Sequence, residues 1–310
     1  MTEDGHGAER KTLASELAPG LYLVATPIGN LEDITLRALR VLKQADLIAC
    51  EDTRHTQKLL NHFGIAVPTL SVHEHNEVSR TALLLEMLRA GQRIAVVTDA
   101  GMPGISDPGM VLARAAIAAG VSVVPVPGAN AALSALVASG LDAETFQFVG
   151  FLPSKAGARL TRLEELRARC AEAMTLVLYE APHRIAETLA DVERVWGAEC
   201  RVVLARELTK LHEEFLRGTV SEVRATLAER GGVRGEMVLL IEAKPGAAEA
   251  ASGEVSLRER LAELEKTEGL SEKDALKRVA KERGVSKSEL YRELQRSQGT
   301  GRPGTRASRD

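Results

Sequence analysis

The stretch that decides the fold is R-I-A-V-V-T-D-A-G-M-P-G-I-S-D-P-G, residues 93–109. Its apolar, β-branched start is typical of a buried parallel strand. The strand leads into a loop that holds two carboxylates, Asp99 and Asp107, among three glycines and two prolines. Ligands of open α/β sheets bind where the strands end, and plain connections there usually take about two to six residues, so this longer loop indicates a binding site. We expect Asp99 to contact the ligand and Asp107 to form a turn or a helix cap.

On either side of this stretch, short apolar strands alternate with helical patterns, which is typical of a layered α/β fold. The helical periodicity is clearest over residues 33–42. Pro125-Val126-Pro127-Gly128 divides the strands into two series, which predicts two α/β domains, residues 20–127 and 128–244. The predicted strands are residues 21–26, 47–50, 69–72, 93–99 and 121–126 in the first domain and 145–151, 174–180, 201–208, 215–220 and 237–243 in the second.

The two ends of the chain differ from this body. Residues 1–19 are polar and predict a disordered leader, and the Ala-, Gly- and Glu-rich residues 244–253 predict a linker. Residues 254–310 predict a small helical appendage with a disordered end, whose helix, glycine-containing turn and helix resemble a helix-turn-helix. From Leu270 onward Lys and Arg outnumber Asp and Glu, whereas the rest of the chain is net acidic. The appendage is therefore basic.

Composition excludes several classes of protein. With 45% hydrophobic residues, the 310-residue chain can build real cores, whereas 3% aromatic residues argue against a base-stacking platform of the RRM or OB kind. Three distant cysteines form neither a disulfide framework nor a zinc site. The N-terminus has no signal-peptide pattern and no apolar run reaches membrane length, so we expect a soluble, cytoplasmic protein without a membrane partner.

Five ordered motifs point to a family. The first, L-Y-L-V-A-T-P-I-G-N-L-E-D-I-T-L-R-A-L at residues 21–39, joins a strand to a helix without the glycine spacing of a dinucleotide loop or the Lys-Ser/Thr of a phosphate loop. The others are V-T-D-A-G-M-P-G-I-S-D-P-G at 97–109, P-V-P-G-A-N-A at 125–131, L-Y-E-A-P-H-R at 178–184 and A-R-E-L-T-K-L-H-E-E at 205–214. With these motifs the chain resembles the tetrapyrrole-methylase-like (class III) S-adenosylmethionine methyltransferases. Within them it is most similar to the small-subunit ribosomal RNA (cytidine-2′-O) methyltransferases.

The resemblance implies two α/β domains with S-adenosylmethionine in the cleft between them, in a homodimer. Carried onto this sequence, it places the cofactor against residues of four segments: Ile28 and Gly29; Thr98, Asp99 and Met102; Asn130 and Ala131; and Glu180. Tetrapyrrole methylases typically carry G-x-G-P-G-D-P in the first loop, of which only Gly29 survives here. That loop also faces the substrate, so the departure argues against a tetrapyrrole substrate and leaves the cofactor in place.

Methyl transfer needs positioning, and a weakly acidic ribose hydroxyl benefits from a base or a cation. Glu180 and His183 are candidate proton acceptors, and Arg184, Arg206 and Lys210 are candidate phosphate or oxyanion contacts. Each of these residues is about as easily explained by a salt-bridge network. Further candidates for substrate contact are Glu207, Arg54, which follows a possible helix cap, and His73 and His75, which lack a third metal ligand at a recognisable spacing. We expect no metal.

The function predicted from the sequence is S-adenosylmethionine-dependent methylation of a cytidine 2′-oxygen in the decoding region of 16S ribosomal RNA. The partner would be 16S ribosomal RNA or the small ribosomal subunit, and DNA, which lacks the 2′-hydroxyl, would not be a partner. Two alternatives remain. One is a tetrapyrrole methylase of the precorrin type, and the other is a DNA-binding regulator that uses the helix-turn-helix.

Overall fold

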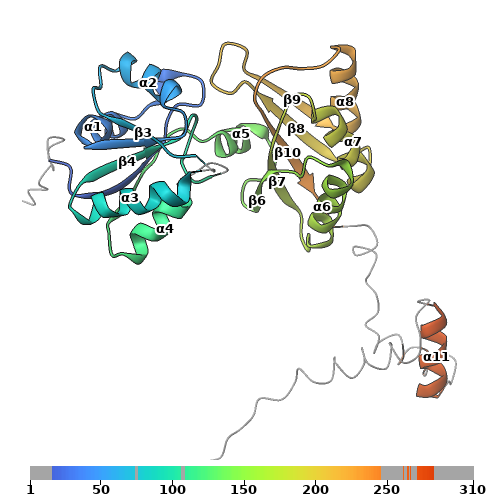
Figure 1. The fold of residues 1–310 in the computed structure, drawn as a ribbon. Helices are drawn as coiled ribbons and strands as arrows, with labels where there is room; N and C mark the ends of the chain where they lie inside the picture. Colours follow the sequence, from blue (N-terminus) through green and yellow to red (C-terminus); the bar gives the residue numbers. More distant parts are fainter. Residues whose placement is uncertain are drawn as a thin grey trace, which may run out of the picture. The chain divides into compact units, whose positions relative to one another are not determined.

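The computed structural model describes residues 16–73, 76–105, 109–245, 261, 264, 266 and 271–282 (Figure 1). The chain divides into two compact units, Met1–Lys244 and Pro245–Asp310. Several sequence predictions lie outside the described residues: His75, Asp107, most of the leader, most of the linker and the second helix of the appendage.

The first sheet is entirely parallel, with strand order β3-β2-β4-β1-β5. Its strands are β1 (Gly20–Val24), β2 (Leu47–Cys50), β3 (Thr69–Ser71), β4 (Arg93–Val97) and β5 (Val123–Val126). Side chains of α1 (Leu36–Gln44) and α2 (Thr53–His62) join one core cluster, and side chains of α3 (Glu77–Arg89) and α4 (Met110–Ala118) join another. Because successive residues of β4 alternate between these clusters, the sheet is covered on both faces, and its strands end at one common edge.

The second sheet is mixed, with strand order β6-β7-β10-β8-β9. Its strands are β6 (Phe146–Phe151), β7 (Met174–Glu180), β8 (Arg201–Arg206), β9 (Glu214–Thr219) and β10 (Met237–Ala243). The last strand, β10, inserts between β7 and β8 and runs antiparallel to both. The helices α6 (Ala156–Ala168), α7 (Ile185–Trp196) and α8 (Val220–Glu229) pack on one face of the sheet.

Helix α5 (Ala131–Ser139) links the two sheets. It follows β5 of the first sheet, yet its buried residues Ala132, Ala135 and Leu136 pack with Val177 and Leu240 on the free face of the second sheet. Figure 1 shows α5 between the two halves. The loop before α5 therefore belongs to the edge of the first sheet, while the helix itself belongs to the core of the second.

The predicted fold class, two α/β domains, is confirmed, and all ten predicted strands form within three residues of their expected bounds. The helix predicted over 33–42 begins later, at Leu36, because the Thr35 side chain caps the backbone of Ala38 while Ile34 is extended. Residues Leu31–Asp33 form a separate 3-10 turn (η1), which the Asn30 side chain caps.

In the second unit, the described part is α11 (Glu272–Glu282) with a few residues before it. Its apolar side chains form a small cluster of their own, made of Leu261, Leu264, Ala275, Leu276, Val279 and Ala280. Among the described helices of either unit, none is long and apolar enough to cross a membrane.

Candidate cofactor and substrate site

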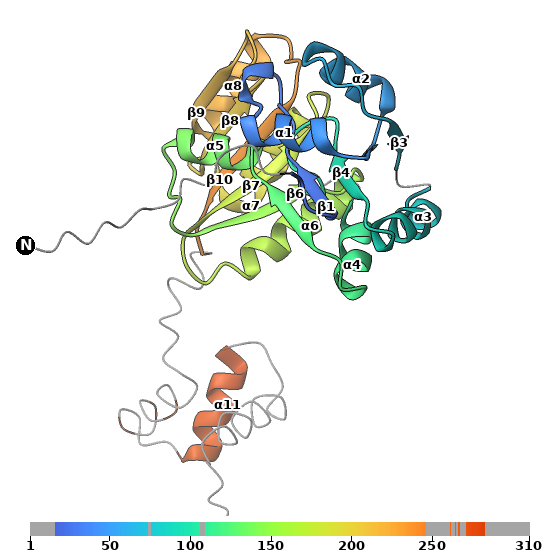
Figure 2. The same cartoon turned by 90° about the vertical axis from the view of Figure 1, so that its left-hand side faces the viewer.

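Three loops meet at the edge where the strands of the first sheet end. Figure 2 views the molecule from the side of this sheet, with α1, α2, α3 and α4 around its strands. The first two loops are joined by paired backbone hydrogen bonds: the N–H of Thr26 donates to the carbonyl of Gly101 at 2.9 Å, and the N–H of Gly101 donates back at 3.1 Å. The third loop packs so closely that a Cβ at Gly128 would lie 2.9 Å from the Cβ of Ala25. Below them, the Thr26 hydroxyl donates to the carbonyl of buried Thr98 at 3.1 Å. The loops therefore form one continuous wall.

The first loop also contacts the second half of the molecule. The N–H of Asn30 donates to Oγ1 of Thr209 at 3.1 Å. A Cβ at Gly29 would lie 2.5 Å from Cγ of Lys210, so only glycine fits there without moving the lysine. Two non-glycine residues of the loop between β8 and β9, which makes this contact, have a positive φ: Glu207 at 52° and Thr209 at 65°. Such backbone strain persists where the surrounding structure fixes it, often at functional sites.

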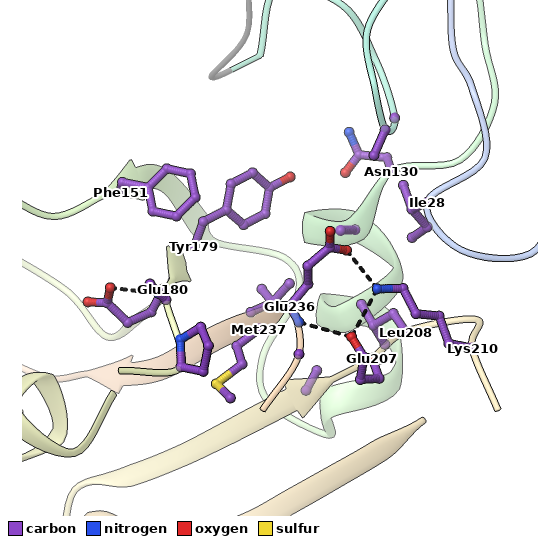
Figure 3. Close-up of a pocket in the computed structure, with 18 of the residues that line it drawn as sticks. Ile28, Asn130, Phe151, Tyr179, Glu180, Glu207, Leu208, Lys210, Glu236 and Met237 are labelled. Carbon is purple, nitrogen blue, oxygen red and sulfur yellow. Dashed lines mark hydrogen bonds and ion pairs between the residues drawn. The ribbon is translucent and has the colours of Figure 1, made fainter. Parts of the chain in front are cut away.

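A pocket of about 670 Å³ opens between this wall and the second sheet (Figure 3). Its size is that of a small-molecule site. Most of the cofactor residues predicted from the sequence and two of the predicted charged residues line it: Ile28, Met102, Asn130, Ala131, Glu180, Glu207 and Lys210. Apolar Leu208 and Val238 complete it from the second sheet.

Lys210 forms a charged cluster with two carboxylates that line the pocket. Its Nζ donates to Oε1 of Glu207 at 2.9 Å and to Oε2 of Glu236 at 3.0 Å. Burial would lower the pKa of Lys210, but the hydrogen bonds to the two carboxylates outweigh it and the pKa is raised. The hydrogen bond from Lys210 lowers the pKa of Glu207, whose carboxylate also accepts from the N–H of Glu236 at 2.9 Å. Glu236 was not predicted from the sequence.

Glu180 lines the pocket, but its buried carboxylate binds residues of the β7–α7 turn and of α7. It accepts from the N–H of Ala181 at 2.8 Å and from the hydroxyl of Thr188 at 2.6 Å, and it pairs with Nε of Arg184 at 3.3 Å. In Figure 3 the carboxylate points away from Lys210. The Arg184 guanidinium also donates to the backbone carbonyls of Leu152 and Pro153. These contacts fix the turn between β7 and α7.

The remaining predicted residues do not line this pocket. His183 is exposed on the β7–α7 turn, beside pocket-lining Pro182. Arg206 is tied to Glu214 at 3.1 Å and to the carbonyl of Arg234 at 3.0 Å, which is the salt-bridge arrangement.

Three further predicted residues follow neighbouring strands of the first sheet: Asp99 after β4, Arg54 after β2 at the start of α2, and His73 after β3. Asp99 accepts from the N–H of Asp52 at 3.3 Å, and Asp52 caps α2. Hydrogen bonds from the exposed Arg54 lower the pKa of Asp52 to about 2. The N–H of His73 donates to the side chain of Asn76 at 2.9 Å. Within the described residues, no group of three or more His, Cys, Asp and Glu side chains could hold a metal ion.

The comparison with known families decides the identity. The family model described as Tetrapyrrole (Corrin/Porphyrin) Methylases matches residues 20–224. This chain belongs to the tetrapyrrole methylases. The resemblance inferred from the five motifs is thereby confirmed. The three loops and most of the residues that line the pocket fall within the matched segment, and lining residues 235–238 lie beyond it.

Curated proteins of one name match most of this chain. A Ribosomal RNA small subunit methyltransferase I from Halalkalibacterium halodurans is 49% identical over 276 residues, which cover 87% of this chain and 93% of that protein. Proteins of the same name from Pasteurella multocida and Bacillus subtilis are 52% and 44% identical, covering 72% and 87% of this chain and 79% and 92% of those proteins.

Two solved methyltransferase structures share the fold. Cobalt precorrin-4 methyltransferase has a TM-score of 0.52 at 20% identity and covers 72% of this chain and 94% of its own. Uroporphyrin-III C-methyltransferase from Thermus thermophilus, solved with S-adenosylhomocysteine, has a TM-score of 0.51 at 21% identity and covers 72% of this chain and 97% of its own. At these identities the likeness establishes the two-domain architecture.

Proposed function

We propose that this protein is an S-adenosylmethionine-dependent methyltransferase that methylates the 2′-oxygen of a cytidine in the decoding region of 16S ribosomal RNA. The observation that carries the proposal is the similarity, over 87% of the chain, to proteins named Ribosomal RNA small subunit methyltransferase I. The cytidine, its 2′-oxygen and the decoding region come from the sequence resemblance. The pocket supplies a site where a donor and an acceptor can meet.

The pocket suits S-adenosylmethionine, which supplies a methyl group activated on a sulfonium. Ile28, Ala131, Leu208 and Val238 offer an apolar slot for the adenine, and the turns beside Gly101 offer backbone polar groups for the amino-acid part. We assign the cofactor to Ile28, Gly29, Thr98, Asp99, Met102, Asn130 and Ala131. For Thr98 and Asp99 this assignment rests on the family resemblance and on their place in the chain, directly before the lining residues Ala100 and Gly101.

On the acceptor side, the proposal gives Lys210 the main electrostatic role. A ribose hydroxyl that attacks a methyl group develops negative charge on oxygen, and an ammonium group held by two carboxylates is a fixed cation that can stabilise it. We assign proton acceptance to His183, which is exposed beside the pocket, and positioning of the β7–α7 turn to Glu180 and Arg184.

Contact with the RNA outside the pocket is assigned to exposed Arg54 and to His73, which follows β3 of the first sheet. From the sequence alone we also assign it to His75, which lies outside the described residues. Glu207 and Arg206 stay in the proposal as residues that shape the substrate side of the pocket, since their side chains are fixed by Lys210 and Glu214. The basic appendage would add salt-sensitive affinity for RNA phosphates. We further propose that the protein works in the cytoplasm as a homodimer.

A panel of acceptors tests the proposal. The purified protein is incubated with tritiated S-adenosylmethionine and, in parallel, with unmethylated small ribosomal subunits, naked 16S ribosomal RNA transcript, DNA of the same sequence and uroporphyrinogen III. We expect label in one or both ribosomal samples and none in DNA. Label in the porphyrinoid alone would favour the tetrapyrrole alternative, and sequence-specific binding to duplex DNA without methyl transfer would favour the regulator.

A further inference from the structure

An irregularity in β6 gathers aromatic side chains at the pocket. The register of β6 against β7 shifts between Phe148 and Gly150, where Gly150 has a φ of 74°. In a regular strand Phe148 and Phe151 would point to opposite faces, because they are three residues apart. The bulge brings them to the same face: Phe148 pairs with Val177, and Phe151 pairs with Tyr179.

The result is a cluster of three rings on the free face of the second sheet. Tyr179 contacts Phe148 with ring centroids 5.1 Å apart and Phe151 with centroids 5.5 Å apart, both edge to face. Phe148 is packed against the core, whereas Phe151 is 57% exposed. Phe151 and Tyr179 both line the pocket, on the side away from Ile28 and Asn130 in Figure 3. A chain with only five Phe and three Tyr thus places three of these eight rings in one cluster, and two of the three line the pocket.

We propose that Phe151 and Tyr179 form the surface on which the target nucleobase stacks when its ribose enters the pocket. The inference rests on the proposed function and names the acceptor subsite within it. Proteins that recognise single-stranded RNA commonly stack its splayed-out bases on aromatic side chains, and enzymes that act on a base hold it between aromatic or apolar side chains. Aromatic rings do this for any base, because every base has a π-face.

The position of the rings favours the acceptor over the cofactor. The joined loops that carry Met102 and Asn130 form one side of the pocket, and the rings form another. The charged group of Lys210, Glu207 and Glu236 also lines the pocket, so a base on the rings leaves its ribose inside the same cavity as the fixed cation. The low aromatic content of the chain argues against a base-stacking platform of the RRM or OB kind. The bulge in β6 nevertheless brings aromatic rings together at the pocket, which the overall composition does not reveal.

The test compares Phe151→Ala with a matched variant of the same strand. Phe146 is 43% exposed on β6 but is not among the lining residues, so Phe146→Ala controls for loss of an exposed ring. For each variant we would measure kcat/KM for tritium transfer to unmethylated small subunits and the affinity for S-adenosylmethionine by calorimetry. We expect Phe151→Ala to lower kcat/KM about ten- to a hundredfold, the worth of one base–aromatic stack, and Phe151→Tyr to restore it. Affinity for S-adenosylmethionine should stay unchanged in all variants, and Phe146→Ala should behave as wild type.

The possible failures are distinguishable. A wild-type protein that labels no ribosomal RNA overturns the proposed function and the inference with it. A wild type that labels ribosomal RNA and a Phe151→Ala variant that does so equally well overturn the inference alone. Loss of S-adenosylmethionine binding in Phe151→Ala would place the adenine on the rings instead. A change in its molar mass by light scattering would place a second copy of the chain there, and both outcomes reject the nucleobase.

Discussion

At the scale of single residues, the pocket depends on a lysine clamped between two carboxylates. Glu207 has a lowered pKa, so its contribution to stability is present above the ordinary value of 4.5 and is lost as pH falls through the folded value. Lys210 has a raised pKa, so its contribution is present below 10.5 and is lost as pH rises through the folded value. The Glu207–Lys210 pair therefore keeps both of its charges throughout the interval between these limits.

Replacing Lys210 by Gln tests its assigned role. If the ammonium group stabilises a developing oxyanion, Lys210→Gln should lower kcat by about a hundredfold or more while affinity for S-adenosylmethionine changes little. The measurement is single-turnover methyl transfer to small subunits, with calorimetry for the cofactor. Exposed Lys155 provides the control variant, Lys155→Gln, which should match wild type. Equal losses of cofactor affinity and rate would contradict the oxyanion role.

A second prediction concerns the stability of a variant at Glu180. Its carboxylate accepts from Ala181 and Thr188, so Glu180→Gln replaces one acceptor oxygen by an amide donor in a buried place. We expect the free energy of unfolding to fall by about 1–3 kcal/mol. Urea titration would measure it, with exposed Glu229→Gln as the neutral control. A variant as stable as wild type but without activity would return Glu180 to the role of proton acceptor.

The site residues could be predicted only in part from the sequence. Ile28, Met102 and Asn130 could be predicted through the family resemblance, and they share one pocket because the loops that follow parallel strands meet at one edge of the sheet. Glu236 could not, because it precedes β10 instead of following a strand. It reaches the pocket only because β10 runs antiparallel between β7 and β8, which no local pattern reveals.

At the scale of elements, the sheets were predictable and their connections less so. Short apolar runs between helical patterns indicated where the strands lie, because the strands of a sheet that is covered on both faces are apolar along their length. The mixed order of the second sheet depends on pairing between distant segments. The bulge at Gly150 is equally invisible in the pattern, because a register shift changes which face Phe151 occupies without changing its sequence neighbours.

The contact between the first loop and the β8–β9 loop yields a prediction. A Cβ in Gly29→Ala would lie 2.5 Å from Cγ of Lys210, so the lysine or the loop must move. We expect methyl transfer to fall several-fold and the free energy of unfolding to fall by about 1–3 kcal/mol. At Gly157 in α6 a Cβ would meet open space, so Gly157→Ala should be neutral or stabilise by about 0.5–1 kcal/mol. Indistinguishable kinetics in the two variants would argue that this contact does not position Lys210.

At the scale of the whole molecule, an acidic catalytic body is joined to a basic appendage. If residues 254–310 bind RNA phosphates, their deletion should reduce the dependence of RNA affinity on salt, by about 0.7–0.9 in the log–log slope for each phosphate that the appendage neutralises. Filter binding of 16S ribosomal RNA over a range of salt concentrations would measure it. Affinity for S-adenosylmethionine should be unchanged, because the pocket lies entirely within the first unit. An unchanged salt slope would refute a role of the appendage in RNA binding.

The central claim is that the pocket between the two sheets methylates a ribose in ribosomal RNA. The most direct measurement is mass spectrometry of nucleosides and fragments from 16S ribosomal RNA after incubation of small subunits with this protein and S-adenosylmethionine. We predict one new 2′-O-methylcytidine, located in a decoding-region fragment and absent with Lys210→Gln. A methyl group on a base, on another nucleoside or on no RNA at all would contradict it.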